Sequence, residues 1–368
     1  MGGQQRCSGG GGPPDRAVPS RRPVVEIPGL PLLLLTIVVV LSGCGSSTVA
    51  GGRTTIPSLL PAGDTCGGSA AQVPSPDRVD LEVQHLDGAI RVLVAVCVDG
   101  RGPFPFVLDT GASTTLFDTH LLDYVRLGAD APPEILHQPG CATVQLHVAV
   151  PRWSLGSTPL TAQSVPVIRL PGFGLAGQPM GLLGSDVLGR FGAIRVDYVA
   201  RILTLDGPEG PALPPGMSVA GNTADPGPSD LVGVGSGSPI PVDVRTSASG
   251  TSVVAQVSFG VRGPYPFDVA SGALTSETTA TLAAGLGLTG TGPVRSVTSF
   301  GCTTSAPMAS SGHWSIGSIP LAPGPIVTAL AATSSPGAEG LIGSDTLSSL
   351  GSFVLDYRSG TLYLGSGA

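Results

Sequence analysis

Short alternations of apolar and polar residues occupy most of the chain from residue 79 onward. They begin with VDLEV at residues 79–83, continue through an apolar run at residues 90–98, and stop at Asp206. The same pattern resumes at Ile240 and continues towards the C-terminus. A period of two residues is the pattern of a half-buried β-strand. The chain therefore predicts two strand-rich segments separated by a break.

Gly, Pro and Ser dominate the parts of the chain that lack this alternation. Residues 45–78 have no period, as is typical of a flexible tether, and the break between the segments contains GPEGPALPPG and GVGSGSP, which are typical of a linker. The predicted order is a signal peptide at 1–43, a tether at 44–78, a first domain at 79–206, a linker at 207–239 and a second domain at 240–368.

Composition narrows the fold class to all-β. Of the 368 residues, 55 are Gly and 36 are Pro, which disfavours a helical bundle and favours many short strands joined by turns. The net charge is −7, every basic residue is Arg, and the chain has no basic block, so we expect no nucleic-acid partner.

The N-terminus has the features of a bacterial export signal. An apolar run from Leu30 to Leu41 is too short to span a bilayer but suits the core of a signal peptide. It ends in LSGC, which resembles a lipobox, so cleavage before Cys44 would leave a lipid-modified cysteine at the new N-terminus. An ordinary cleavage site that contains a Cys is the alternative. We expect an exported chain, anchored by its lipid in the outer face of the plasma membrane or the cell envelope.

One peptide occurs twice in the chain. RGPFPFVLDTGAST at residues 101–114 returns as RGPYPFDVASGALT at residues 262–275, an offset of 161. Further matches follow at this offset or at 159, WSLGSTPL with WSIGSIPL and GLLGSD with GLIGSD. The strand-rich segments are therefore two copies of one unit, named here the first repeat (79–206) and the second repeat (240–365).

Both repeats resemble the retropepsin-like and pepsin-like aspartic peptidases, in particular exported bacterial members of the actinobacterial type. The resemblance rests on FVLDTGAS at residues 106–113 followed by Leu-Leu-Gly at residues 182–184. It implies a bilobal all-β fold in which two β-lobes meet about a pseudo-twofold axis. Each lobe would contribute one Asp-Thr/Ser-Gly loop, and a β-hairpin flap would cover a cleft that takes peptides.

The resemblance assigns the catalytic chemistry to Asp109. Aspartic peptidases use two carboxylates that share one proton and activate a water molecule between them. In the second repeat the acid is replaced by Ala270, which cannot activate water. Asp268, two residues earlier, would face Asp109 only if the register slipped by two residues. Whether the chain is an enzyme therefore stays open.

The residues that support the acid recur in both repeats. Thr110 and Ser271 can hydrogen-bond across the interface between the lobes and fix the two loops. Gly111 and Gly272 let the chain turn and present backbone N–H groups to the carboxylate. The second loop thus keeps the scaffold of a catalytic loop without its acid.

Four cysteines follow Cys44 in the sequence, namely Cys66, Cys97, Cys141 and Cys302. An even number in an exported chain permits two disulfides, with three possible connectivities. The resemblance places Cys141 and Cys302 in or near the two flaps, which implies that they bond to each other and leave Cys66 with Cys97. A bond between the flaps would hinder substrate access.

Two functions remain open from the sequence. The first is an envelope-anchored aspartic endopeptidase that acts through Asp109; the second is a pseudopeptidase that binds peptides or proteins on the same fold. Either function implies a peptide or protein partner. We expect the protein to be a monomer, because the second repeat occupies the place that a second chain takes in a dimeric peptidase. The five His residues lack metal-ligand spacing, and no cofactor motif is present, so we expect neither a metal nor a cofactor.

Overall fold

Strands make up most of the described chain, which confirms the all-β prediction. The computed structural model describes residues 66, 78–86, 89–138, 141–172, 178–221, 231, 236–248, 250–299, 302–328 and 335–365. The signal peptide, Cys44 and all of the tether except Cys66 and Arg78 lie outside the described residues. Within the described ranges, no helix has both the length and the apolar character needed to cross a bilayer.

The described residues of the first repeat form twelve strands and three short helices. The strands are β1 (Arg78–Leu86), β2 (Ala89–Val98), β3 (Arg101–Leu108), β4 (Leu116–Asp118), β5 (Ala129–Gln138), β6 (Cys141–Val150), β7 (Trp153–Leu155), β8 (Thr158–Leu160), β9 (Gln163–Ile168), β10 (Gly181–Leu183), β11 (Ala193–Asp197) and β12 (Ile202–Leu205). The helices are α1 (Ser185–Leu188) and the 3₁₀ turns η1 (Thr119–Asp123) and η2 (Gly189–Phe191).

The second repeat has a matching set of elements. Its strands are β14 (Ser236–Ser247), β15 (Gly250–Phe259), β16 (Arg262–Val269), β17 (Glu277–Thr278), β18 (Val294–Ser299), β19 (Cys302–Ser310), β20 (Trp314–Ile316), β21 (Ile319–Leu321), β22 (Pro325–Val327), β23 (Gly340–Ile342), β24 (Ser352–Asp356) and β25 (Thr361–Gly365). Its helices are α2 (Ala280–Leu286) and α3 (Ser344–Ser349).

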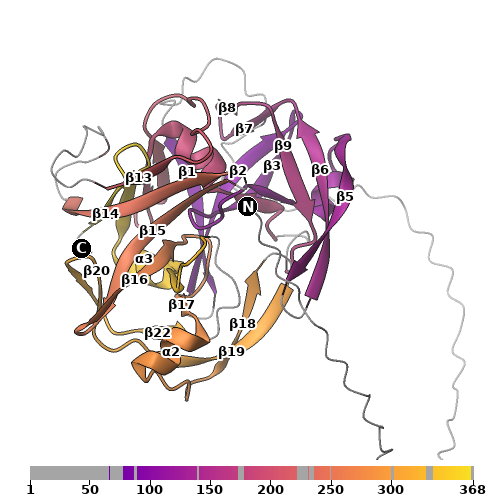
Figure 1. The fold of residues 1–368 in the computed structure, drawn as a ribbon. Coiled ribbons are helices and arrows are strands. Elements are labelled where there is room, and N and C mark those ends of the chain that lie inside the picture. The colour runs from indigo at the N-terminus through magenta and orange to yellow at the C-terminus, as the bar shows by residue number, and fades with distance from the viewer. Residues whose placement is uncertain are drawn as a thin grey trace, which may run out of the picture. The chain divides into compact units, whose positions relative to one another are not determined.

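The two repeats pair their strands in the same way (Figure 1). In the first repeat, β2 and β3 form an antiparallel pair, and β10 lies parallel to β3. In the second repeat, β15 and β16 form the corresponding pair, and β23 lies parallel to β16. Each repeat also carries one long hairpin, β5–β6 in the first and β18–β19 in the second. The sequence duplication is thus a duplication of strand pairings.

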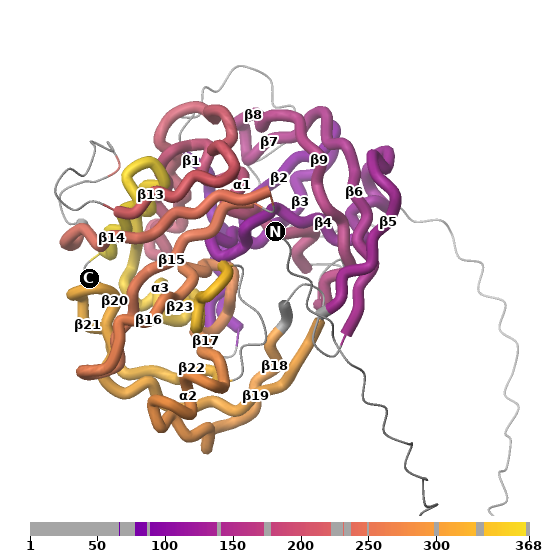
Figure 2. The backbone as a smooth tube through the Cα atoms, in the orientation of Figure 1, coloured from indigo at the N-terminus to yellow at the C-terminus, as the bar shows by residue number. Residues whose placement is uncertain are grey.

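Strands from both repeats also pair with each other. β11 lies antiparallel to β24, with Arg195 opposite Val354. β12 continues this sheet on one side and β25 on the other. Figure 2 shows the chain path, with the first repeat in indigo to magenta and the second in orange to yellow. The repeats are therefore joined by backbone hydrogen bonds as well as by side chains.

The main apolar core includes side chains from both repeats, beside two smaller buried clusters in the described residues. It forms because each strand turns one set of alternating residues inward, such as the fully buried Phe106 and Phe267 at equivalent positions of β3 and β16. Trp153 and Trp314 are buried in the same way, and their indole N–H groups donate to backbone oxygens at 2.8 and 2.9 Å.

The segment expected as a linker contains one further strand, β13 (Ser218–Ala220). Val219 of β13 lies opposite Val244 of β14, and β14 itself begins before residue 240. Three residues are too few to show a period of two, so the Gly- and Pro-rich surroundings concealed this strand.

Candidate active site

Asp109 follows strand β3 directly, and a buried backbone fixes its position. The three residues before it are at most 1% exposed, and β3 is held on one side by parallel β10. The Asp109 N–H donates to the Leu183 carbonyl oxygen at 3.0 Å. Since Leu183 belongs to the Leu-Leu-Gly element, the structure brings together the two motifs on which the sequence resemblance rests.

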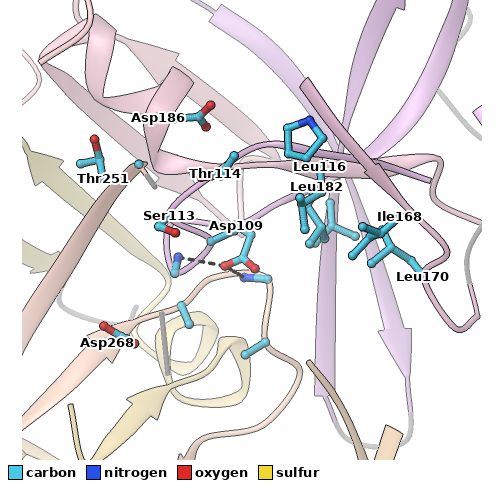
Figure 3. Close-up of a pocket in the computed structure, with 18 of the residues that line it drawn as sticks. Asp109, Ser113, Thr114, Leu116, Ile168, Leu170, Leu182, Asp186, Thr251 and Asp268 are labelled. Carbon is cyan, nitrogen blue, oxygen red and sulfur yellow. Dashed lines mark hydrogen bonds between the residues drawn. The ribbon is translucent and has the colours of Figure 1, made fainter. Parts of the chain in front are cut away.

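Two backbone amides hold the Asp109 carboxylate (Figure 3). The Gly111 N–H donates to Oδ1 at 2.9 Å, and the Gly272 N–H donates to the same oxygen at 3.1 Å. A Cβ added to Gly272 would lie 2.4 Å from both Cβ and Cγ of Asp109, so only Gly permits this approach. The second repeat therefore contributes directly to the environment of the acid in the first.

Burial raises the pKa of the Asp109 carboxyl above its ordinary value. Loss of hydration is the main cause, because it disfavours the charged form; the hydrogen bonds from Gly111, Gly272 and Ala112 act in the opposite direction. The protonated acid consequently persists to higher pH than an exposed Asp. No second carboxylate accepts a hydrogen bond from these amides.

Thr110 and Ser271 link the two loops crosswise. The Thr110 N–H donates to Ser271 Oγ at 3.1 Å, and the Ser271 N–H donates to Thr110 Oγ1 at 3.2 Å. Each hydroxyl then donates to a carbonyl of the opposite repeat, Thr110 Oγ1 to Val269 at 2.7 Å and Ser271 Oγ to Leu108 at 2.9 Å. Both side chains are fully buried, so these four bonds are closed to water.

Ala270 occupies the position in the second repeat that Asp109 occupies in the first. Its N–H donates to the Ile342 oxygen at 3.0 Å, just as Asp109 donates to Leu183. A Cβ added to Gly111 would lie 2.4 Å from the Ala270 Cβ, the same distance that separates an added Gly272 Cβ from Asp109 Cβ. A methyl group therefore stands where an equivalent carboxylate would begin.

Asp268 does not replace the missing acid. Phe267 pairs with Gly340 as Phe106 pairs with Gly181, so the register of the second repeat has no two-residue slip. Asp268 is 1% exposed, and its carboxylate accepts hydrogen bonds from the Ser335 N–H at 3.3 Å and from the Ser335 hydroxyl. Figure 3 shows its side chain apart from that of Asp109.

A cavity of about 1090 Å³ opens over the two loops. Asp109 and Ala270 lie in its wall, together with Gly111 and Gly272. Both long hairpins contribute further lining residues, namely Leu136, Gln145 and His147 from β5–β6 and Ser296 and Val297 from β18–β19. A space of this size accommodates a ligand larger than a single amino acid.

The described cysteines form two disulfides, and they are the pairs that the resemblance implies. Cys141 bonds to Cys302, with their Cα atoms 6.1 Å apart, and Cys66 bonds to Cys97, with theirs 5.6 Å apart. Cys141 begins β6 and Cys302 begins β19, so the first bond joins the two hairpins that line the cavity.

The comparison with known proteins agrees with this geometry. Residues 94–187 match a family model described as aspartyl protease. This segment of the chain is aspartic-protease-like. The match includes Asp109 and the Leu-Leu-Gly element, and it ends before the second repeat. A search of curated proteins found no match.

Two further acids, Asp186 of α1 and Asp345 of α3, have structural contacts. Asp186 Oδ1 accepts from the N–H and the hydroxyl of Thr115 at 2.8 and 2.7 Å. Asp345 Oδ1 accepts from the N–H and the hydroxyl of Ser276 at 3.0 and 2.8 Å. Burial raises the pKa of both carboxyls. These contacts hold the chain that follows each active-site loop.

Sequence reasoning missed one acid of the cavity, Glu277. It lines the cavity and is 4% exposed, and it stands 161 positions after Leu116. Extending the alignment of the repeats past the Asp-Thr-Gly loop would have revealed this exchange of Leu for Glu. Among the residues that the structure describes, no group of three or more His, Cys, Asp or Glu side chains could hold a metal ion.

Proposed function

We propose that this chain binds extended peptide segments in the cavity between its repeats and does not hydrolyse them. The observation that carries this proposal is the side chain at position 270. The backbone around Ala270 reproduces that around Asp109, yet it presents a methyl group. The cleft is thus retained and the catalytic pair is not.

The chemistry of peptide hydrolysis explains why one acid is insufficient. In an aspartic peptidase one carboxylate takes a proton from water while its partner, sharing a proton, polarises the scissile carbonyl. Asp109 supplies one of these groups, and the methyl group of Ala270 cannot supply the other. Asp268, the only acid near Ala270 in sequence, is occupied by Ser335.

The bilobal arrangement about a pseudo-twofold axis is part of this proposal. It is supported by the repeated strand pairings and by the reciprocal hydrogen bonds of Thr110 and Ser271. In this arrangement residues 79–206 and 240–368 are the two lobes, and one chain suffices to build the cleft. The protein would therefore act as a monomer.

We also propose that the protein works outside the plasma membrane, held by a lipid on Cys44. The LSGC sequence and the Gly- and Ser-rich residues that follow it support this placement. A tether of this composition would let the folded part reach partners away from the bilayer surface. The partners would be peptides or unfolded segments of exported proteins.

An aspartic endopeptidase is the second candidate. Two observations favour it. Two backbone N–H groups donate to the Asp109 carboxylate, and the four hydrogen bonds of Thr110 and Ser271 between the two loops are all present. A site made from Asp109 of two chains would require the second repeat to leave its place. The interface of β11 with β24 opposes such an exchange.

Peptide cleavage and peptide retention distinguish the two candidates. The full-length chain, purified in detergent, is incubated with a quenched fluorescent peptide library between pH 3 and pH 7, and bound peptides are identified by mass spectrometry. We expect retention without cleavage. Cleavage by the wild-type chain that is lost in Asp109→Asn would overturn the pseudopeptidase and establish the peptidase.

The variant Ala270→Asp tests the underlying geometry. A carboxylate at this position would face Gly111 as Asp109 faces Gly272, so we expect peptidase activity at acidic pH. Ala270→Asn, which has the same shape without the acid, is the matched control and should stay inactive. The double variant Ala270→Asp with Asp109→Asn should lose the gained activity.

A further inference from the structure

The two sides of the cavity differ at Glu277. In the first repeat, Leu116 of β4 lies opposite Leu182 of β10. In the second repeat, Glu277 of β17 lies opposite Leu341 of β23, which is the same pairing. The structure therefore places a carboxyl group where the first repeat has the side chain of a leucine.

Part of the cavity wall formed by the first repeat is an apolar cluster. Leu116, Ile168 and Leu170 form a buried cluster against which Leu182 packs, and all four line the cavity. Figure 3 shows these four side chains together on one side of Asp109. Such a wall favours an apolar side chain of a ligand, because contact removes apolar surface from water.

Glu277 is buried without a compensating partner. Its side chain lines the cavity, the residue is 4% exposed, and Oε2 has no hydrogen-bond partner in the described structure. A buried carboxylate without a partner is costly, so burial raises the pKa of Glu277 to about 8, with the charge of Asp345 adding to the effect.

The strands that pair with β17 carry no cation; Arg295 lies on β18, whose Val297 packs with Val327 of β22. Strands β22 and β23, which pair with β17, carry no ionisable side chain, and neither does α2. Asp345 of α3 and Asp268 of β16 are the acids on the neighbouring elements. In the first repeat Arg190 lowers the pKa of Asp186, but the residue equivalent to Arg190 is Ser349. The second repeat thus has no basic residue at the position of Arg190.

Other charged groups of the cavity wall come from the opposite repeat. Arg190 donates to Glu209 at 2.9 Å, and burial lowers the pKa of Arg91. Asp109 and Asp186 are the remaining carboxyls of that repeat in the wall, and His147 lies on β6. A ligand cation at Glu277 would therefore lie beside the carboxyl groups of the second repeat.

We propose that Glu277 makes the second-repeat side of the cavity a subsite for a Lys or Arg side chain of the bound peptide, while the apolar cluster around Leu116 takes an apolar side chain. This inference rests on the proposed peptide-binding function. A bound ammonium or guanidinium group would give Oε2 the partner it lacks and would favour the charged carboxylate. Below about pH 8, binding would therefore release a proton from Glu277.

Fluorescent octapeptide mixtures test the subsite on the full-length chain. Each mixture is random except for one position, which is fixed as Arg, as citrulline or as Leu, and every position is scanned. Citrulline has nearly the shape of Arg without its charge. Dissociation constants are measured by fluorescence polarisation at pH 6 and pH 8.5.

We expect one position at which Arg binds about tenfold more tightly than citrulline at pH 8.5. The preference should be smaller at pH 6, where Glu277 is protonated, and absent in Glu277→Gln. Glu277→Leu, which installs the residue of the first repeat, should favour Leu at that position. Glu339→Gln is the matched control, because it removes one acid that does not line the cavity, and it should keep the preference for Arg.

The outcomes separate this inference from the function on which it rests. Peptides that bind with equal affinity for Arg and citrulline at every position overturn the cation subsite and leave peptide binding intact. A preference for Arg that survives in Glu277→Gln also overturns the cation subsite and leaves peptide binding intact. Failure of every mixture to bind overturns the peptide-binding function and the subsite together. Because Glu277→Gln removes an unpartnered buried acid, the variant should fold, which thermal melting verifies.

Discussion

Replacing Thr110 by Val tests whether the crosswise bonds hold the two repeats together. Val keeps the shape of Thr but removes Oγ1, which donates to the Val269 oxygen at 2.7 Å and accepts from the Ser271 N–H at 3.2 Å. Thr110 is 0% exposed, so water cannot replace either bond. Each orphaned backbone group costs about 1–3 kcal/mol, which gives a total loss of roughly 2–6 kcal/mol.

Urea unfolding followed by tryptophan fluorescence measures this loss. The chain has two Trp residues, Trp153 in the first repeat and Trp314 in the second, so the signal reports on both. A loss of about 3 kcal/mol also lowers the melting temperature by about 6–12 °C for a domain of 150–250 residues. Thr304→Val, at an exposed position of β19, is the matched control and should change stability by no more than about 0.5 kcal/mol. If the two variants are equally stable, the crosswise bonds do not stabilise the protein.

A change of pH and the removal of a disulfide should each lower the unfolding free energy. The folded-state pKa of Glu277, about 8, exceeds its ordinary value of 4.5, so its contribution to stability is complete below pH 4.5 and is lost as the pH rises through 8. Relative to Glu277→Gln, the unfolding free energy of the wild type should therefore fall by on the order of 3–5 kcal/mol across that window, and parallel pH curves would contradict this. The double variant Cys141→Ser, Cys302→Ser opens a link across 161 residues and should lose up to about 5 kcal/mol of unfolding free energy. It should also bind fluorescent peptides faster in stopped-flow measurements, since the joined hairpins line the cavity; an unchanged association rate would show that the bond does not limit access.

The duplication made much of the fold predictable. A period of two residues identifies strands locally, and the related copy of RGPFPFVLDTGAST that follows 161 residues later shows that both halves share one architecture. The same offset showed that Ala270 is equivalent to Asp109 and that Cys141 is equivalent to Cys302. The family resemblance then implied that the two cysteines form a disulfide. Strand β13 escaped prediction because three residues show no period.

The sequence by itself determined the residue types of the two loops, including the loss of the second acid at position 270. It did not decide the register of the second repeat, because Asp268 and Ala270 lie only two residues apart, at the end of β16 and just after it. The parallel pairing of β16 with β23 decided it, since backbone hydrogen bonds permit one alignment and leave Asp268 with Ser335. The environment of Glu277 was also decided by tertiary structure alone. A pKa depends on which groups surround a side chain in space, and the neighbours of Glu277 come from segments that are distant in sequence.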